Sequence, residues 1–500
     1  MTQNLDLTDI QGNIVKAYGA FNFTKARYLF LRVDNGDSGR NFVGAIATKV
    51  TSAVRWDKNS KPSATTNIGF TFSGLQALKL PTASLLGFPE AFAMGMKKRK
   101  DILGDDGPSD PAHWDKIWQE TVHIWISING QSTQAVDERY QWILEQIEAS
   151  DGGVTLLTGH RGEGDENDLP YQDASVLYDA DGNPSSKEHF GYTDGIGDPV
   201  FEGQTNIQAR VRGRGKLTRS GDWEPLATGE FILGHIDEAM EYPKTAPTPK
   251  LLAHNGTFMV YRKLHENVGS FNRFLDEQSK IYSGSKELLA AKFAGRWRDN
   301  GAPVVIAPDD ASKAEWDKYY ASADFAGKKK LLIDFTYNND IDGAKCPLSA
   351  HIRRINPRGS LEFGVKDAFE RPGALVDRRR ILRRGLPYGE VKDATRDDGN
   401  HGIIFMVLNA DINRQFEFVQ QQWINYANDF KEGNDKEVLL GNHDAENPGK
   451  VVIQVAQGSG EPPHFVNNIP RLVETRGGDY FFIPSITALK MIAGGIVDPT

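Results

Sequence analysis

The sequence predicts an α+β fold in which strands and helices alternate along the whole chain. In residues 122–128, apolar residues recur at every second position, so Val122, Ile124, Ile126 and Ile128 share one face of a predicted strand. Similar patterns occur in both halves with helical patterns between them, which favours layered sheets and helices over an all-helical bundle. The other predicted strands are residues 28–33, 258–262, 331–335, 403–408 and 451–455.

Helical patterns lie between these strands. Residues 74–80 have the spacing of a short helix. Asp411 is placed to cap a second helix, because a carboxylate before an apolar stripe can accept hydrogen bonds from the first free N–H groups. The stripe of that helix consists of Phe416, Val419 and Trp423.

A coil rich in glycine and arginine covers residues 203–221. Such a segment is typical of a connection between domains. We therefore predict an N-terminal domain of residues 1–215 and a C-terminal domain of residues 216–500. No short-period repeat is visible, and a two-fold duplication would be too diverged to detect in one sequence.

The composition is that of a globular protein with an acidic surface. The 500 residues include 39% hydrophobic and 25% charged residues, which is ordinary for a chain that buries a large core. The net charge is −9, and nucleic-acid binding needs a basic face, so we expect no nucleic-acid partner. Cys346 is the single cysteine, which excludes an intramolecular disulfide and a cysteine-rich metal site.

The first ten residues carry acids and lack the apolar segment of a secretory signal. No run of about 18 apolar residues is present, so we expect no membrane span. We expect a cytoplasmic protein; secretion by a route not visible in the sequence is the alternative. The sequence leaves open whether the protein is a monomer or a homodimer.

The motifs of several other enzyme classes are incomplete or absent in this sequence. The glycine-rich segment that ends at Leu217 lacks the first glycine of a phosphate loop and has leucine where a hydroxyl must hold magnesium. Gly195 and Gly197 begin a dinucleotide-like triplet, but Val200 takes the place of the third glycine. No zinc-protease, Cys-x-x-Cys or serine-hydrolase motif occurs. Nucleotide hydrolases, zinc enzymes and serine hydrolases therefore lose support.

The first segment whose residues could take part in catalysis is a glycine-rich turn around Asp194. Gly191, Gly195 and Gly197 let the backbone bend and approach a flat ligand closely. A carboxylate held in such a turn can accept and donate protons. Alone, this pattern is more often an ordinary turn.

The second segment surrounds His351. A neutral imidazole nitrogen can bind iron, and the neighbouring Arg353 and Arg354 could neutralise the two propionates of a haem. A lone histidine is more often a packed or surface residue, and His123 and His235 have the pattern of structural residues.

The third segment is a basic run in an otherwise acidic chain: Arg378, Arg379, Arg380, Arg383 and Arg384. Such a cluster is unusual unless some of the guanidinium groups face an anion. The carboxylates of a haem or a developing peroxide anion would be suitable partners. The alternative is a basic strand exposed to solvent.

Together, and in this order, the three segments resemble the dye-decolorizing peroxidases. The shared motifs are Gly191-x-x-Asp194-Gly195, then Cys346-Pro347-x-x-Ala350-His351 up to Arg358, then Ile381-Leu382-Arg383-x-Gly385-x-Pro387-Tyr388-Gly389. Shorter matches lie at residues 9–14, 92–96, 103–105, 255–258 and 480–485, so the resemblance covers nearly the whole chain. The long stretch from His351 to Arg383 is similar to the longer branch of the family, which includes fungal enzymes.

The resemblance implies two ferredoxin-like domains, related to dimeric α/β barrels, with one haem b per chain in the C-terminal half. It implies that His351 is the iron ligand, Asp194 the acid–base residue of the opposite, distal side, and Arg383 the distal arginine. It also implies a peroxidase that reduces hydrogen peroxide and oxidises dyes and phenolic or other aromatic reductants in one-electron steps. Further expected haem-lining residues are Gly195, Ile196, Gly197, Arg353, Asn356, Pro357, Arg358, Arg383, Ile403 and Phe405.

One position departs from part of the family. Gly385 stands where compact bacterial members carry a distal asparagine, so the hydrogen bond of that asparagine is missing here.

These roles lead to expectations about the reaction. An aspartate has an intrinsic pKa of about 4, so Asp194 would work as a base well into acid, and we expect an acidic optimum. If Ile403 and Phe405 crowd the distal side, bulky dyes would be oxidised at the surface. Trp223, Tyr388, Trp423 or Tyr426 could relay the electrons, although each aromatic residue is more often part of a core.

Three other functions remain open at this point. The protein could carry haem or release its iron, with incidental peroxidase activity. It could be a haem enzyme of another class, such as a chlorite dismutase or a catalase-like enzyme. It could also be an α+β protein that binds no haem.

Overall fold

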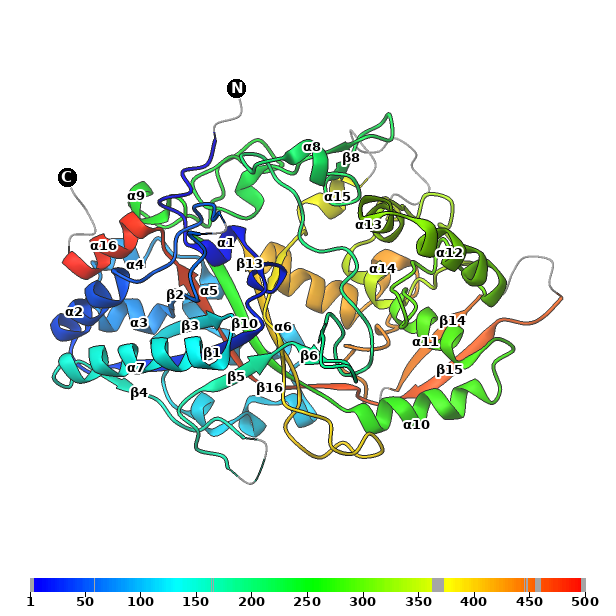
Figure 1. The fold of residues 1–500 in the computed structure, drawn as a ribbon, viewed down its shortest axis with the longest axis horizontal. Coiled ribbons are helices and arrows are strands. Elements are labelled where there is room, and N and C mark those ends of the chain that lie inside the picture. The colour runs from blue at the N-terminus through cyan, green and yellow to red at the C-terminus, as the bar shows by residue number, and fades with distance from the viewer. Residues whose placement is uncertain are drawn as a thin grey trace.

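The computed structural model describes residues 4–495 except residues 58, 163, 165, 362–372, 445, 447 and 455–459. Ten of the described strands form one antiparallel sheet that runs through both halves of the chain (Figure 1). The predicted α+β fold is confirmed. The order across the sheet is β11 (Leu382–Arg384), β13 (Gly402–Asn409), β10 (Thr257–Glu266), β16 (Val473–Ile483), β2 (Ala64–Phe70), β3 (Ile124–Gly130), β1 (Lys25–Val33) and β4 (Val154–Leu156), with β12 (Pro387–Tyr388) on β13 and β5 (Gln172–Ser175) on β1.

The N-terminal half has the β-α-β-β-α-β order of a ferredoxin-like unit: β1, α2 (Gly36–Ala47), β2, β3, α7 (Thr133–Ala149) and β4. Its four strands lie in the order β2-β3-β1-β4. Polar caps begin both helices, because the side chain of Asn35 accepts from the N–H groups of Asp37 and Ser38, and Ser132 accepts from Ala135.

The C-terminal half repeats this topology. The chain runs through β10, a group of helices, β11, β13, the two π-helical segments η7 (Asn413–Glu417) and η8 (Val419–Ile424), and β16. The strand order β11-β13-β10-β16 is the order of the first unit with corresponding strands. Thus the two ferredoxin-like units implied by the resemblance are confirmed, and topology reveals a duplication that the sequence hides.

The two units join where Phe482 of β16 pairs with Phe70 of β2. The sheet curls, so Phe30 of β1 lies 5.1 Å from Tyr261 of β10 between ring centroids, and β5 contacts β12. The pairing between described strands nevertheless follows an open path rather than a closed barrel. The domain boundary predicted at residues 215 and 216 falls in the long connection from β5 to β10 and stays a prediction.

The helices of the C-terminal unit form a lobe at the right of Figure 1. Its members are α10 (Val268–Ser279), α11 (Lys286–Ala294), α12 (Asp310–Ser322), α13 (Phe325–Ile333), α14 (His351–Ile355) and the hairpin of β14 (Gly449–Ile453) and β15 (His464–Ile469). The remaining elements that matter for packing are α1 (Gly12–Val15), α3 (Phe72–Ala77), α4 (Thr82–Leu85), α5 (Glu90–Met94), α6 (Lys100–Leu103), α8 (Ile207–Arg210), α9 (Lys250–Ala253), α15 (Ala374–Asp377), α16 (Ile486–Gly494), β6 (Leu177–Tyr178), β7 (Pro184–Ser185), β8 (Lys216–Leu217) and β9 (Trp223–Glu224).

Most predicted elements are confirmed. Strands β1, β3, β10, β13 and β14 and helix α3 fall where the patterns placed them, although β14 ends at Ile453 and residue 455 lies outside the described residues. The side chain of Asp411 caps its helix by accepting from the N–H of Arg414 at 3.0 Å. That helix is π-helical rather than α-helical.

The strand predicted at residues 331–335 is wrong. Residues up to Ile333 belong to helix α13, whose first turn is capped by Asp324 accepting from Gly327 at 2.7 Å. A short apolar run fits the end of a helix as well as a strand, so the cap residue decides between them.

Strand β3 is buried on both faces. Ile124, Ile126 and Ile128 belong to the core face that the alternation predicted. Trp125, Ser127 and Asn129 on the other face line a large internal cavity.

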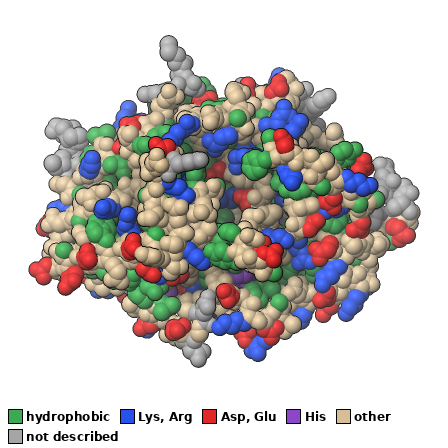
Figure 2. All heavy atoms as spheres, in the orientation of Figure 1, with side chains coloured by type: hydrophobic (Ala, Val, Ile, Leu, Met, Phe, Trp, Pro, Cys, Tyr) green, Lys and Arg blue, Asp and Glu red, His purple; other side chains and the backbone are tan. Residues whose placement is uncertain are grey.

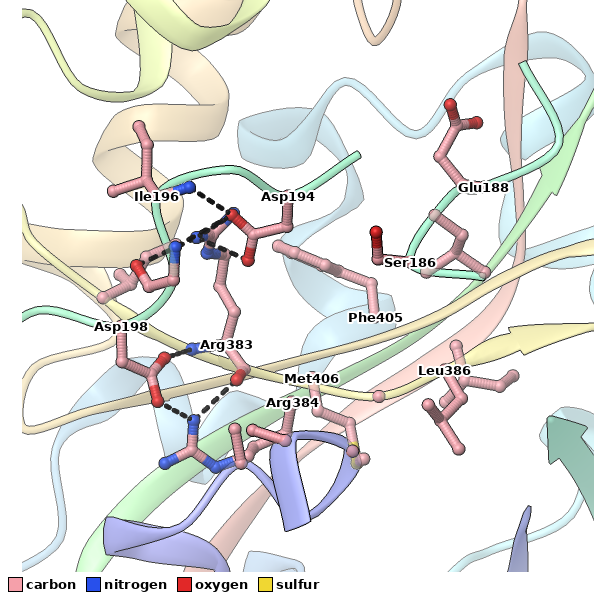
Figure 3. Close-up of a pocket in the computed structure, with 18 of the residues that line it drawn as sticks. Ser186, Glu188, Asp194, Ile196, Asp198, Arg383, Arg384, Leu386, Phe405 and Met406 are labelled. Carbon is pink, nitrogen blue, oxygen red and sulfur yellow. Dashed lines mark hydrogen bonds and ion pairs between the residues drawn. The ribbon is translucent and has the colours of Figure 1, made fainter. Parts of the chain in front are cut away.

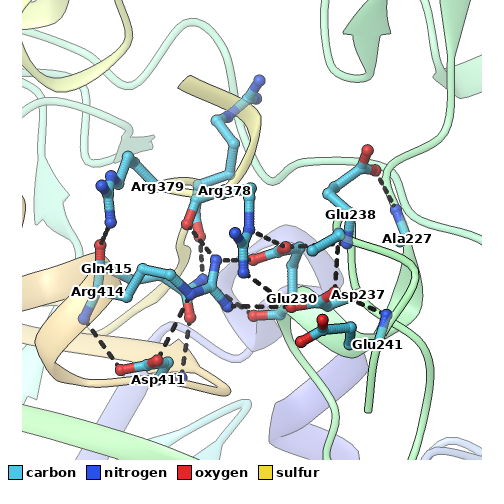
Figure 4. A network of polar contacts seen from close by, with 12 residues as sticks. Ala227, Glu230, Asp237, Glu238, Glu241, Arg378, Arg379, Asp411, Arg414 and Gln415 are labelled. Atoms are coloured by element: carbon cyan, nitrogen blue, oxygen red, sulfur yellow. Dashed lines mark hydrogen bonds and ion pairs between the residues drawn. The ribbon is translucent and has the colours of Figure 1, made fainter. Parts of the chain in front are cut away.

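A buried ionic network fixes the start of the basic run (Figure 4). Arg414 on η7 pairs with Glu230 at 2.6 Å, and Arg378 pairs with Asp237 at 3.1 Å. The guanidinium of Arg379 donates to the carbonyl of Arg414 at 2.6 Å. These arginines hold the segment after α15 against the loop near residue 230. Within the described ranges, no helix is long and apolar enough to cross a bilayer.

Candidate active site

A cavity of about 1250 Å³ lies between strands β11 and β13, helix α14 and the inner face of β3. Ligand pockets for drug-sized molecules measure roughly 300–1,000 Å³, so this cavity has room for a large planar ligand and a path to it. Most residues with predicted catalytic roles meet at its walls.

Asp194 and Arg383 face each other at one wall (Figure 3). Nη2 of Arg383, on β11, lies 3.1 Å from each carboxylate oxygen of Asp194. Oδ1 of Asp194 also accepts from the N–H groups of Ile196 at 3.2 Å and Gly197 at 3.1 Å. The turn and the strand therefore present one carboxylate and one guanidinium side by side to the cavity.

The turn needs glycine at Gly197. Its φ of +71° lies in the left-handed region, and an ideal Cβ there would collide with the guanidinium of Arg214. Glycine thereby allows Arg214 to donate to the carbonyl of Ile196 at 2.9 Å, which closes the turn around Asp194.

The charges around Asp194 keep it ionised. Loss of water near the cavity walls raises the pKa of the Asp194 carboxyl, but the Arg383 guanidinium and the N–H groups of Gly197 and Ile196 outweigh this effect, so the pKa lies below its usual value. The Asp194 side chain is 50% exposed because it faces the open cavity, so peroxide and water can reach it. Such a carboxylate can accept a proton even in acid.

A second ion pair holds the strand that carries Arg383. Asp198 accepts from the backbone N–H of Arg383 at 3.1 Å and pairs with Arg384 at 2.7 Å. Arg384 also donates to the carbonyls of Asn13 and Ile14 and so links β11 to α1. Arg383 is thus held by its backbone as well as by its side chain.

His351 lies at another wall, at the start of α14. Its Nδ1 lies 3.5 Å from Oε2 of Glu437, and the Glu437 carboxylate is fully buried. The same carboxylate accepts from the N–H groups of Leu439 at 2.9 Å and Leu440 at 2.6 Å. Burial raises the pKa of Glu437, but the nearby His351 and these N–H groups bring it below the usual value.

This arrangement fits a haem with an iron ligand at His351. With Nδ1 directed at Glu437, Nε2 is left for the cavity, and the structure gives it no protein partner among the described residues. A carboxylate behind a metal-binding histidine fixes its ring and makes it a stronger donor. At the same cavity, Nε of buried Arg296 also lacks a protein partner within the ranges described, and such a donor can meet a carboxylate of a cofactor.

The cavity gathers most of the predicted haem-lining residues. Asp194, His351 and Arg383 reach it from three separate segments, and Phe405 lies next to Asp194 in Figure 3. The other predicted residues found at its walls are Gly195, Ile196, Gly197, Asn356 and Ile403.

Arg353, Pro357 and Arg358 are not brought to the cavity, which corrects the expected contacts. Nη1 of Arg353 donates to Asp340 at 2.9 Å and to the carbonyl of Cys346 at 2.6 Å, so it holds the loop before α14. Nη1 of Arg358 donates to the carbonyls of Ile333 and Phe335, at the end of α13. Buried carbonyls compete for arginines, and sequence spacing does not show them.

Arg354 is likewise turned away from the cavity. It donates to the carbonyl of Trp423 and pairs with Glu432 at 2.7 Å. Arg353 and Arg354 therefore hold helix α14 in place and do not face the cavity.

Sequence reasoning missed three carboxyl groups. Glu437 gives no local signal, because it lies in a loop far along the chain from His351. Glu188 and Glu266 line the cavity, and burial raises the pKa of both carboxyls, further for Glu266 because of the charge of Glu188. Glu188 directly precedes the glycine-rich segment, and this position beside His189 was the available hint.

The four aromatic residues considered as electron relays have different positions. Trp423 and Tyr388 are buried, whereas Tyr426 is 41% exposed. Trp223 donates its indole N–H to Asp334 at 3.2 Å. Their roles in electron transfer stay predictions.

The chain is similar to known proteins over nearly its whole length. Residues 9–161 match a family model described as the DyP dimeric alpha+beta barrel domain. The chain is 28% identical to Peroxidase 2 of Mycetinis scorodonius, over 97% of this chain and 87% of that protein. It is 27% identical to the multifunctional dye peroxidase DyP2 of an Amycolatopsis species, over 97% and 96%.

Solved structures show the same fold. A fungal DyP-type peroxidase from Auricularia auricula-judae superposes with a TM-score of 0.75 at 23% identity, covering 98% of this chain and 100% of that one. A dye-decolorizing peroxidase in complex with 2,6-dimethoxyphenol superposes with a TM-score of 0.74 at 24% identity and the same coverage. The chain is thus similar to dye-decolorizing peroxidases of bacteria and fungi along nearly its whole length, and it shares their fold.

Proposed function

We propose that this protein is a haem peroxidase that reduces hydrogen peroxide and oxidises dyes and phenolic or other aromatic reductants. The proposal takes its substrate classes from the relatives, among them a multifunctional dye peroxidase and an enzyme in complex with 2,6-dimethoxyphenol. We further propose one haem b per chain, bound through Nε2 of His351. When bound, the haem would supply the redox chemistry of peroxide and of the one-electron donors.

The residues of the chain would manage protons and charge. Asp194 would take the proton from one oxygen of hydrogen peroxide and return it to the other, so that the departing oxygen can leave as water. Arg383 stays charged and stabilises the negative charge that develops on the departing oxygen. Glu437 holds the ring of His351 in one orientation by facing its Nδ1.

One observation carries the proposal. The cavity presents an ionised carboxylate, paired with an arginine, and a histidine backed by a buried carboxylate. A haem carrier would need His351 but would gain little from an acid–base group such as Asp194. The pair of Asp194 and Arg383 therefore favours peroxide chemistry over simple haem transport.

The test is Asp194→Asn in the haem-loaded protein. We expect the Soret band to stay, because the iron ligand is unchanged, and the rate of reaction with one equivalent of peroxide to fall by about 10²–10⁴-fold, the usual contribution of a positioned acid–base group. Asp181→Asn, the same change at an exposed position, is the matched control. An unchanged rate of reaction with peroxide in Asp194→Asn would show that Asp194 is not the acid–base residue.

His351→Ala tests the ligand. We expect loss of the Soret band of the purified protein, while the exposed-site control His113→Ala retains it. A His351→Ala protein that kept its haem spectrum and peroxide-dependent dye bleaching would overturn the whole proposal. Steady peroxide or chlorite breakdown without added reductant would point instead to the other haem enzyme classes.

A further inference from the structure

Four cations gather at the rim of the cavity: Arg55, Arg210, Arg214 and Lys329, which we call the cationic rim. They come from three distant parts of the chain, namely the segment before β2, the region around α8, and α13. On the face shown in Figure 2, Lys and Arg side chains lie around a central hollow. A concentration of positive charge at this place is unexpected in a chain of net charge −9.

The rim cations are close enough to repel one another. Burial lowers the pKa of Arg210, and the charges of Arg214 and Arg55 lower it further. Burial and the charges of Arg214 and Arg210 likewise lower the pKa of Lys329. The carboxylates that act on the rim from the facing turn are Asp194 and Asp198, and both are already paired, with Arg383 and Arg384.

Internal contacts do not account for these cations. Nε of Arg214 donates to Ile196, and Nη1 of Arg210 donates to the carbonyl of Thr205 at a long 3.4 Å. Within the part of the chain that the structure describes, none of the four rim residues forms an ion pair. Like charges held together without counter-ions create a local positive potential that attracts anions.

Two of the four rim residues are more exposed than the arginines suited to the carboxylates of a cofactor. Arg296 and Arg380 are buried at the cavity walls, with 2% and 8% of their surface exposed. Arg55 and Lys329, by contrast, are exposed to solvent. A molecule that arrives from solution meets the rim before it reaches the buried arginines.

Aromatic side chains adjoin the rim. Trp56, next to Arg55, stacks on Tyr18 with ring centroids 6.0 Å apart, and Phe21 is 43% exposed. All three line the same cavity. The opening therefore combines ring surfaces with positive charge, which suits a flat aromatic molecule that carries an anionic group.

We infer that the cationic rim is a recognition site for aromatic reductants bearing a carboxylate or sulfonate, which it selects over neutral reductants of the same shape. The inference rests on the proposed peroxidase function. The guanidinium groups bind the anionic group while the ring packs against Trp56 and Phe21. The rim thus acts on the capture of substrate, before any electron moves.

The experiment compares two phenols that differ in charge: 2,6-dimethoxyphenol, and syringate, which is the same phenol with a para carboxylate. The test variant is Arg55→Glu with Lys329→Glu. We expect the ratio of kcat/KM for syringate to kcat/KM for 2,6-dimethoxyphenol to fall at least about tenfold, because two attractive charges become repulsive. Comparing this ratio between the variant and the wild type cancels the intrinsic difference in oxidation potential between the two phenols.

Lys330→Glu is the matched control for charge. Lys330 neighbours Lys329 on α13, is exposed, and is not part of the cavity lining. It should leave the ratio within about twofold of the wild-type value, since a screened charge outside the rim acts weakly. An equal fall in Lys330→Glu and in the rim variant would mean that net charge, rather than the rim, sets the preference, and would overturn the inference.

Two further readouts separate the possible failures. Calorimetric binding of syringate to the ferric protein without peroxide should weaken in the rim variant, and this holds even if the peroxidase proposal fails. Haem content, read from the Soret band, should be unchanged. If the rim variant loses haem, the rim holds the cofactor's own carboxylates and the inference is wrong; if turnover of 2,6-dimethoxyphenol persists with an unaltered ratio, only the rim inference fails.

Discussion

Arginines from a single stretch of sequence lie in two different environments in this structure. In the network of Figure 4, Arg378 is matched by the buried carboxylates of Glu230 and Asp237, together with Arg414 of η7. A few residues later, Arg383 extends into the cavity, where its partner Asp194 is itself open to ligand. The same residue type is thus neutralised by buried carboxylates in one place and paired beside an open cavity in the other.

The difference also separates the network from the cationic rim. In the network, each carboxylate neutralises at least one guanidinium, so no net charge is left for a ligand. At the rim, four cations share two carboxylates that are already paired. The number of carboxylates within reach, rather than the local density of arginines, indicates which group is available for recognition.

The largest effect is expected on stability, when one arginine of the ionic network of Figure 4 is removed. Arg414→Ala should lower the free energy of unfolding by about 3–5 kcal/mol at neutral pH, because it leaves the buried carboxylate of Glu230 with only the more distant guanidinium of Arg378, 3.8 Å away. Burial already raises the pKa of Glu230, and loss of Arg414 raises it further. Since the folded state then binds this proton more tightly, the destabilisation should shrink as the pH falls toward the usual value of the glutamate.

Urea unfolding at neutral and at acid pH measures this change. Arg396→Ala, which removes an exposed partner of Asp398, is the control and should stay within about 1 kcal/mol of the wild type. Equal stability of Arg414→Ala and the wild type would show that the network does not hold the fold.

The second largest effect is expected on the rate of reaction with peroxide, when Arg383 at the cavity is replaced. Arg383→Ala should lower the second-order rate with peroxide by about 10²–10³-fold, as expected when a donor to developing negative charge is removed. Its unfolding free energy should change far less than in Arg414→Ala, because the Arg383 side chain is 29% exposed and its partner Asp194 is 50% exposed, so no carboxylate is left buried and unpaired. Stopped-flow mixing with peroxide gives the rate, and Arg383→Lys should restore part of it.

A smaller effect on activity is expected at the wall of the cavity that carries His351. Glu437→Gln keeps the shape but removes the charge behind His351, and changes of this kind behind metal ligands typically cost about 10–100-fold in activity or affinity. We also expect a higher reduction potential of the bound iron, because a less basic imidazole stabilises the oxidised metal less. Spectroelectrochemical titration measures the potential, and an unchanged value would contradict the proposed partnership.

The smallest effect is a shift in pH dependence. With Asp194 as the base, as proposed, activity should be present above its pKa and lost as the pH falls through it. Arg383 keeps that pKa below the usual value of 3.8 in the wild type, whereas burial alone would raise it. In Arg383→Ala the acid limb of the peroxide rate should therefore move to higher pH. A limb at the same pH in both proteins would show that another group titrates.

Much of the fold follows from local patterns. Apolar patterns placed four strands of the large sheet and strand β14 of the separate hairpin correctly, and the cap at Asp411 marked the start of the helix after β13. The error at residues 331–335 arose because a short apolar run has no period of its own, while the decisive cap at Asp324 lies several residues earlier. The duplicated topology was invisible because it exists in the order of strands rather than in repeated residues.

The candidate site was predictable where a segment's own residues shape it. The glycines around Asp194 exist to make that turn, and the cavity indeed gathers Asp194, His351 and Arg383. Sequence reasoning failed where the partner is distant: Arg353 serves Asp340, and Glu437 serves His351. Such pairs form by packing between elements, so no spacing rule within one segment can reveal them.

Gly385 limits how this active site can change. Its φ of +108° belongs to a backbone region that side chains avoid, and an ideal Cβ there would overlap the carbonyl oxygen of Ile404 on the neighbouring strand. An asparagine at this position, which the family resemblance leads one to expect in compact members, is therefore not one substitution away. Strands β11 and β13 would first have to move apart, so evolution or a protein engineer would need to alter the main chain before introducing the amide.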